Sequence, residues 1–456
     1  MRYAIRDVLL LMLGESRIKS LLETALSLST ADETEVSLTA VDDATTRFDN
    51  NAIHQNVAET DAVLEVRAVI GRRVGTASTN HFAPDSLARA VETAGEAARY
   101  QPESEDFVGL PEPRPIQRVH SFDEAAAAAS RSPELRARVV SGLCRAAASE
   151  SALAAGAYAT ATAETAGANS RGVWAYHPST SVELTLVVAC EDGSGYAHGT
   201  SWRLDRVDAE ALGAEAIQRA LASRHPRLIP PGEYPIILEP YAVVDIVEQL
   251  AAEGMGALAV QEGRSWMNGR MGQRALSPLI SIWDDGLDPE GEPQPFDCEG
   301  VPKERVDIVN AGVPTAPVYD THTAAREPGQ LSTGHAQPVD EDWDGPMPGN
   351  LHLAPGDSSV EDMIRGTQRG LYVTRFWYTN IVAERDCVLT GTTRDAAFLI
   401  ERGEIVCPAQ TLRFTQGLIP ALKNVAALGR EARPIGGFYG SHRLPAMKLE
   451  SFRFTG

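Results

Sequence analysis

Ten histidines are the residues of this chain with the most chemistry to offer, because neutral imidazole is a common zinc ligand. Hydrolytic zinc on a helix is held by two histidines about one turn apart, with a glutamate beside the first acting as general base. No two histidines here are four residues apart, and none lies between His225 and His322. The strongest helical pattern of the second half, about 242–258, therefore cannot form a zinc site from a histidine pair.

A metal site from distant residues is the alternative. His322, His335 and His352 fall in one region of the sequence and could meet Asp320 or Cys298 in the folded chain. Scattered histidines are more often polar surface groups or hydrogen-bonded core groups. We therefore expect no metal bound by this chain, and we keep these histidines as the first to test.

The five cysteines are odd in number and form no CxxC pair, which argues against a disulfide framework and favours a reducing compartment. Cys298 lies between Asp297 and Glu299, and neighbouring carboxylates raise the pKa of a thiol and suppress the thiolate. We interpret Cys298 as structural. The sequence also contains no GxSxG, no P-loop and no GxGxxG after a strand.

Length and charge restrict the class of protein. A chain of 456 residues exceeds one compact core, so two or three domains are expected. The net charge of -21 repels phosphate backbones and disfavours nucleic acid as a partner. The apolar run at 8–13 is too short to span a bilayer, and we assign it to an amphipathic first helix instead of a signal peptide. We expect a cytoplasmic protein that binds no membrane.

The elements that must position these side chains fall into two parts. In the first half, strand patterns and helix patterns come in separate runs, which predicts an α+β fold. The strands are expected at 35–41, 60–78 around a turn at Gly71, 157–163, 172–176 and 181–190, and the helices at 84–100, 133–149 and 208–223.

A boundary is predicted at 225–235, which carries four prolines. We expect an N-terminal α+β domain over 1–225, with a possible sub-boundary near 101–117. The remainder, 226–456, has many short apolar runs separated by Gly, Pro and Asp, which predicts a β-rich C-terminal domain with the one helix at 242–258.

Several segments in order resemble one known family. They are PGEYPIIL at 231–238, EGRSW at 262–266, SPLISIWDD at 277–285, STGHA at 332–336 and GLYVT at 370–374. In the first half, 71–78 and 169–172 fit as well. Each segment alone is weak, but together they make the chain similar to the TldD/PmbA family of metallopeptidase-related proteins over nearly its whole length.

The resemblance implies a particular branch. The TldD branch carries HExxxH on the helix before the EGRS-like segment and holds zinc there, with a later cysteine as a further ligand. The PmbA/TldE branch lacks the motif and pairs with TldD. Counting back from Glu262, the motif falls on Glu248, Gln249 and Glu253. A glutamine cannot act as general base at neutral pH, and carboxylates without imidazole suit harder cations than zinc.

This degenerate motif has a plain structural explanation. Apolar residues at helical spacing form one buried face, and Glu248 and Glu253 are expected to be solvated or to face a partner. The apolar positions are Val243, Val244, Ile246, Val247 and Leu250.

By resemblance, the chain would be the subunit without metal of a TldD/TldE-type peptidase. It would bind no cofactor itself, pair with a TldD-type subunit that carries zinc, and complete a cleft in which unfolded peptide is held by strand addition. Loop residues on a rigid scaffold are the usual ligand contacts. Candidates for lining the cleft are Arg264, Ser332, Thr333, Gly334 and His335, although such segments more often only form turns, here at Gly263 and Gly334.

Two other functions stay open at this point. The chain could be a hydrolase, alone as a homodimer or paired, that acts on a specialised metabolite. It could also be a non-catalytic modulator of another protein, such as DNA gyrase. A zinc-bearing relative encoded beside it would favour the peptidase subunit.

Overall fold

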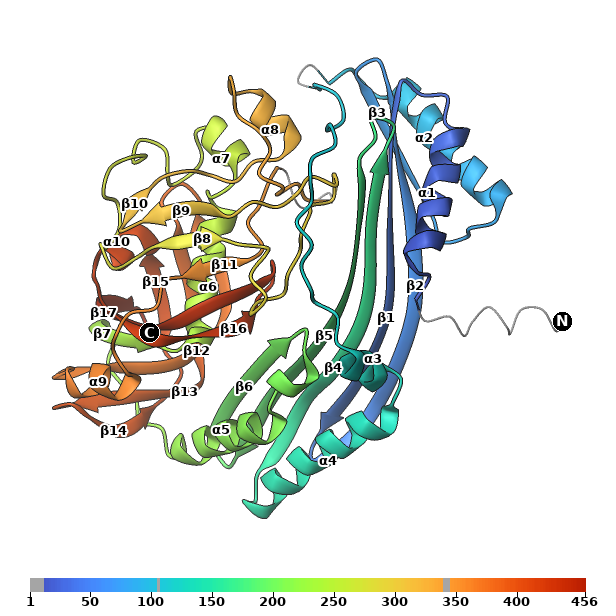
Figure 1. Cartoon of the computed structure of the whole chain (residues 1–456). Helices are drawn as coiled ribbons and strands as arrows, with labels where there is room; N and C mark the ends of the chain where they lie inside the picture. Colours follow the sequence, from blue (N-terminus) through green and yellow to red (C-terminus); the bar gives the residue numbers. More distant parts are fainter. Residues whose placement is uncertain (1–11, 105–106, 339–344) are drawn as a thin grey trace.

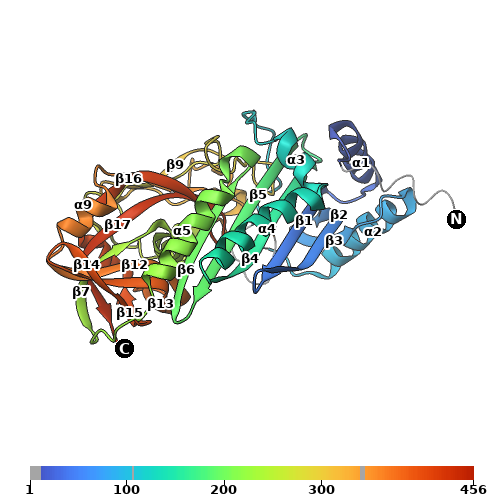
Figure 2. The same cartoon turned by 90° about the horizontal axis from the view of Figure 1, so that it is seen from below.

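The computed structural model describes residues 12–104, 107–338 and 345–456, and Figures 1 and 2 show two parts packed side by side. Most of the apolar run at 8–13 lies outside these ranges, and the first described helix, α1, covers Glu15–Leu28. No helix in the described part is long and apolar enough to cross a membrane.

The first part is built on a six-stranded antiparallel sheet, called the N-terminal sheet below, in the order β3-β2-β1-β4-β5-β6. Its strands are β1 (Glu33–Asp49), β2 (Ala52–Ile70), β3 (Arg73–Thr79), β4 (Leu153–Asn169), β5 (Trp174–Cys190) and β6 (Gly193–Ser201). β1 pairs with β4 from Glu35 to Phe48, so the connection at 101–117 does not separate two sheets.

One face of the N-terminal sheet is covered by helices. Alternate residues of β1, including Val36, Leu38 and Phe48, are buried beneath them, as the period of two in a strand requires. The helices are α1, α2 (Pro84–Tyr100), α3 (Glu124–Ser130), α4 (Pro133–Ser149) and α5 (Ala209–Ala222), with the short 3-10 helix η1 at Leu204–Arg206. The helices predicted at 84–100 and 133–149 are confirmed at both ends, and the side chain of Ser132 caps α4 as expected.

The second part is rich in strands, which confirms the α+β class with a β-rich C-terminal half. Its eleven-stranded sheet, the C-terminal sheet, closes on itself because β7 pairs in parallel with β12 and in antiparallel fashion with β17. The strands are β7 (Gly232–Leu238), β8 (Ile282–Asp284), β9 (Val306–Asn310), β10 (Val313–Pro314), β11 (Leu351–Leu353), β12 (Arg369–Ala383), β13 (Val388–Glu401), β14 (Glu404–Ala409), β15 (Arg413–Gly417), β16 (Val425–Gly436) and β17 (Ser441–Phe454). Short helices α8 (Thr321–Ala325), α9 (Val360–Arg365) and α10 (Leu418–Lys423) complete it.

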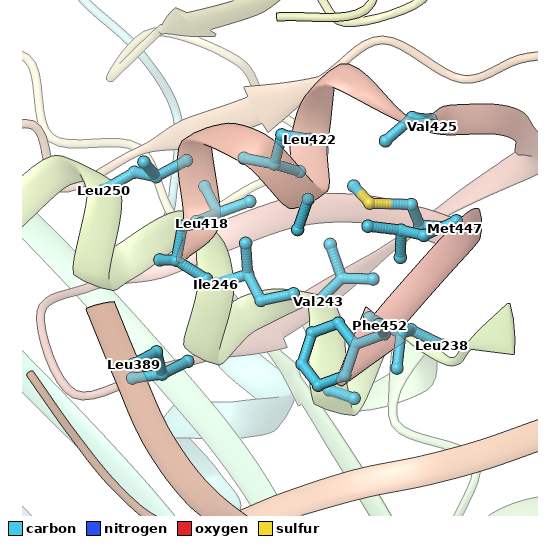
Figure 3. Packing of buried hydrophobic residues seen from close by; sticks show 14 of the residues in the cluster. Leu238, Val243, Ile246, Leu250, Leu389, Leu418, Leu422, Val425, Met447 and Phe452 are labelled. Atoms are coloured by element: carbon cyan, nitrogen blue, oxygen red, sulfur yellow. The ribbon is translucent and has the colours of Figure 1, made fainter. Parts of the chain in front are cut away.

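The helix α6 (Pro240–Ala252) lies in the core of this part. Figure 3 shows Val243, Ile246 and Leu250 of α6 facing the buried side chains of α10 and β17, so the helix is held by tertiary packing. The prediction that it continues to 258 is wrong. The helix ends just before Gly254 and Gly256. A Cβ at Gly256 would meet the carbonyl oxygen of Pro346 at 2.1 Å, so the backbone at Pro346 lies too close to Gly256 for a side chain. A separate turn, α7, covers Ala257–Gln261.

The two parts meet on the face of the N-terminal sheet that the helices leave open. Arg67 of β2 lies 3.4 Å from Glu35 and 3.6 Å from Glu299 of the C-terminal part. At the other end of the junction, Arg219 of α5 forms an ion pair with Glu239 at the start of α6. In Figure 1 the connection between α2 and α3 runs down between the two parts.

The contact between β6 and α5 depends on a glycine. A Cβ at Gly195 would meet the carbonyl oxygen of Ala216 at 2.1 Å and the amide nitrogen of Ala220 at 2.6 Å. We expect Gly195→Ala to push α5 off the sheet and to lower the free energy of unfolding by about 1–3 kcal/mol in urea denaturation. The control is Gly142→Ala in α4, where a Cβ meets nothing within 4 Å and the better helix former should add roughly 0.5–1 kcal/mol. Equal effects of the two changes would contradict this packing.

The junction carboxylate Glu35 makes stability depend on pH. Burial raises its pKa to about 7, Arg67 opposes the shift, and Glu299 adds to it. Because the folded state holds this proton more tightly than the unfolded chain, the stability it contributes is present at acid pH and is lost as the pH rises through about 7. We therefore expect Glu35→Gln to raise the melting temperature by roughly 2–4 °C at pH 8 and by less at pH 5. The exposed Glu65→Gln on the neighbouring strand is the control, and a gain that is the same at both pH values would contradict the assignment.

Candidate functional site

The first position of the degenerate motif is occupied by a buried carboxylate. Glu248 of α6 is 6% exposed. It accepts hydrogen bonds from the backbone N–H of Phe438 at 3.1 Å and of Tyr439 at 2.8 Å, and it lies 2.9 Å from Nε2 of His442. The expectation that Glu248 is solvated or faces a partner is wrong, because the loop before β17 folds over it and supplies these donors.

His442 is held in one tautomer by its second contact. The backbone N–H of Leu351 donates to Nδ1 of His442 at 3.1 Å, so that nitrogen must be an acceptor. The ring proton is then on Nε2, where it is donated to Glu248. His442 is 1% exposed, and the pair is sealed inside the C-terminal part.

The network continues from β11 to the segment that carries His335. The backbone N–H of Asn350 donates to Oδ2 of Asp284 at 2.7 Å, and Nε2 of His335 lies 2.8 Å from the other oxygen of that carboxylate. Nδ1 of His335 is 2.9 Å from the hydroxyl of Thr333, which also bonds to the backbone of Tyr319.

Charge fixes the protonation of this second pair. Burial alone would raise the pKa of Asp284, but the nearby ammonium of Lys303 and the hydrogen bonds from His335 and Asn350 hold it well below its usual range. Burial and the charge of Lys303 lower the pKa of His335. The pair is therefore an ionised aspartate that accepts a hydrogen bond from a neutral imidazole.

We call this network the buried polar chain: Glu248, His442, the backbone of Asn350 and Leu351, Asp284, His335 and Thr333. It joins two sets of residues that the sequence singled out separately, the motif on α6 and the segment 332–335. Sequence reasoning missed Asp284 and His442 as members. Asp284 falls inside one of the family-like segments, but its partners lie far along the chain and no spacing rule connects them.

The remaining candidates lie around the end of α6. Gln249 is partly exposed, and Glu253 is half-buried at the C-cap of the helix. Burial and the carboxylate of Glu384 raise the pKa of Glu253, and Arg264 opposes the shift. Arg264 itself pairs with Glu262 at 2.7 Å. Arg264 therefore lies near Glu253 and is partly exposed, whereas Ser332, Thr333, Gly334 and His335 are all buried.

The described residues do not bring together the histidines that were kept as an alternative metal site. On α6 the carboxylate of Glu248 already has three donors, and glutamine and glutamate hold the other two motif positions, so this helix does not fit a zinc ion. His322 contacts Arg326, and His352 stacks on Trp283 with ring centres 5.2 Å apart, so neither joins His335.

Within the described ranges, one group of three side chains has its potential ligand atoms close enough together to hold a metal ion. These side chains are Glu191, Asp192 and His225, all exposed. It lies on the loops that flank β6 and α5, apart from α6.

Cys298 has the environment of a structural cysteine. Burial and the carboxylates of Asp297 and Glu299 raise the pKa of its thiol.

Comparison with known families covers most of the chain. Three family models match: the PmbA/TldA metallopeptidase domain 1 over 34–98, the central domain over 109–224 and the C-terminal domain over 231–456. The closed sheet with its buried helix therefore belongs to a class of metallopeptidase-related proteins. The chain is a member of the PmbA/TldD family.

Relatives and solved structures agree with this assignment. Metalloprotease PmbA of Escherichia coli O157:H7 is 25% identical over 451 residues, 95% of each chain. A Haemophilus influenzae metalloprotease TldD homolog is 25% identical over 225 residues, 48% of this chain and 46% of that protein. The crystal structure of TldE from Thermococcus kodakarensis superposes with a TM-score of 0.86 and 21% identity over 96% of this chain and 99% of that one. The crystal structure of a Thermotoga maritima protein described as a putative modulator of a DNA gyrase superposes with a TM-score of 0.84 and 18% identity. The superposition covers 96% of this chain and 100% of that one.

The contacts of Glu248 generate a stability prediction. In Glu248→Gln the amide places its own donor against the N–H groups of Phe438 and Tyr439, so at least one of these is left without an acceptor. We expect a loss of roughly 2–4 kcal/mol in urea denaturation, because an unsatisfied buried polar group is costly. Hydrogen exchange at 437–440 should also become faster.

The matched control is Glu253→Gln, a change of the same chemistry at the other motif position, where the side chain is half-buried and the expected loss is below about 1 kcal/mol. If the two variants lose the same free energy of unfolding, Glu248 does not hold the loop at 437–440 in place.

Proposed function

We propose that this chain is the subunit without metal of a two-subunit metallopeptidase of the PmbA/TldD family. One observation carries the proposal: the position where a zinc ligand would be needed on α6 holds Glu248, whose carboxylate is already bonded to the loop at 438–442. A metal there would have to displace all three donors and would still meet no imidazole from the helix.

The partner in this proposal is a TldD-type subunit that carries HExxxH and the zinc ion. Its ion would supply the activated water, and this chain would supply part of the wall of the cleft. The relatives support such a role, since one is described as a metalloprotease and a solved structure of the same fold is a TldE. The five free cysteines fit a complex that works in the reducing cytoplasm.

The substrate class that we propose is unfolded peptide, held in extended form. Arg264, with its partly exposed guanidinium, is the candidate that can reach a bound peptide directly. Ser332, Thr333 and Gly334 would contribute the shape of the wall. His335 is completely buried, so its role would be to hold Thr333 in place through the buried polar chain.

The test is native mass spectrometry of this chain, alone and after co-expression with the zinc-bearing relative from the same genome. We expect a one-to-one heterodimer with one zinc ion, peptidase activity on unfolded peptides for the pair, and loss of that activity when the glutamate of the partner's HExxxH is changed to glutamine. This chain alone should be inactive and should hold no stoichiometric zinc.

A control separates a surface metal from a site in the core. His225→Ala removes the imidazole of the exposed group with Glu191 and Asp192, and any weak zinc bound there should disappear. A homodimer of His225→Ala that still holds one zinc per chain and cleaves peptide by itself would overturn the proposal.

A further inference from the structure

A pocket of about 410 Å³ lies at the junction of the two parts, and none of the motif positions Glu248, Gln249 and Glu253 lines it. One wall is the end of β6 and the first turns of α5. The other wall comes from the C-terminal part, through the loop at Pro289–Glu290, the end of β16 and Arg443 of β17. We call it the β6–β16 pocket.

Arginine is concentrated in this pocket. Arg203, Arg206, Arg433 and Arg443 line it, in a chain whose net charge is -21. Three acids also line it, and each arginine has an acidic neighbour. Arg433 is 3.3 Å from Glu215, and Arg443 is 2.8 Å from Asp288. A guanidinium has five N–H donors, so one ion pair leaves most of them available. The pocket is therefore not a site of unpaired positive charge, but its arginines keep N–H donors that an acceptor in the pocket can use.

Two buried groups at the pocket have no partner among the described residues. They are Nε of Arg443 and Nδ1 of His198. The side chain of His198 is 5% exposed, and its Nε2 lies 3.3 Å from a carboxylate oxygen of Glu183. If Nε2 donates to Glu183, Nδ1 of the neutral ring is an acceptor. The pocket thus lacks an acceptor for Arg443 and a donor for His198, and buried groups of this kind normally have partners.

The walls also present open strand edges. β6 is the last strand of the N-terminal sheet. Among the described strands β16 pairs only with β17, and the segment at 356–358 bonds to its other edge at 428–430, before the residues that line the pocket. The backbone N–H and C=O of His198 point to the open edge, where both contact the hydroxyl of Tyr241. Alternate residues of a strand direct their main-chain groups to the same edge, so those of Thr200 also face the pocket. An extended chain could pair there.

These features select one kind of ligand. A small anion supplies acceptors for Arg443 but no main chain for the edge at Thr200. An uncharged peptide supplies main chain but no carboxylate to accept from the remaining N–H donors of the arginines. We propose that the β6–β16 pocket binds an extended peptide with a carboxylate, its main chain alongside β6 at Thr200, its carboxylate on Arg443 and Arg433, and one N–H on His198. This inference goes beyond the proposed function, because it needs neither zinc nor the residues at 332–335.

The test uses the full chain and fluorescein-labelled ten-residue peptides. One peptide ends in Glu-Glu with a free carboxyl terminus, and its match ends in Gln-Gln with an amide. Fluorescence anisotropy should show binding of the acidic peptide, weakened at least about tenfold by Arg443→Gln and by rising salt. The matched variant is Arg365→Gln, an exposed arginine of α9 that pairs with Asp362, and it should change the dissociation constant by less than about twofold.

A second arm leaves the protein unchanged, so it holds even if Arg443→Gln folds poorly. An acidic peptide methylated at alternate backbone nitrogens keeps its charge but cannot pair with a strand edge, and we expect it to bind at least about tenfold more weakly. Equal binding of the acidic and amidated peptides, equal binding by Arg443→Gln, or full binding of the methylated peptide would overturn the proposal. Displacement of the peptide by an equal concentration of inorganic phosphate would also overturn it, since the pocket would then be a site for small anions.

Discussion

A buried carboxylate must find hydrogen-bond donors, and in this chain that requirement decides what α6 can do. Glu248 takes its donors from the loop before β17 and from His442. In a zinc-bearing helix the same position would be an imidazole facing an ion. In this chain the carboxylate of Glu248 instead holds the loop before β17 in place through hydrogen bonds. The space near Glu248 is consequently part of the core, and the partly exposed residues of this region lie at the end of α6, at Glu253 and Arg264.

The sequence predicted the elements with clear local signals. Both ends of α2 and α4 were predicted correctly, because Pro84 and Pro133 occupy the first turn and apolar residues follow with the helical period of 3.6. The β-rich second half followed from short apolar runs. The end of α6 was missed because the apolar pattern continues past Ala252, while the close approach of Gly256 to Pro346 is a tertiary contact that no local rule contains.

For the candidate site, the sequence supplied the motif positions but not their surroundings. The absence of histidine between 225 and 322 excluded a helical zinc pair with no need of a structure. The burial of Glu248 could not be foreseen, since its three donors come from residues nearly two hundred positions away. Asp284 and His335 are likewise brought together only by the fold. Residue types predict which chemistry is possible, and long-range pairing decides which of it occurs.

The closure of the C-terminal sheet has a consequence for how the chain is made. The N-terminal sheet is complete once residue 201 has been synthesised, and the last of its covering helices, α5, is complete by residue 222. β7, in contrast, is the first strand of the second part, and its antiparallel partner β17 ends only at Phe454. On a ribosome, the apolar faces of β7 and α6 and the carboxylate of Glu248 would stay uncovered until β17 has been synthesised. A truncation that removes only β17 would therefore leave the first part able to fold, and the second part exposed to aggregation and to cellular proteases.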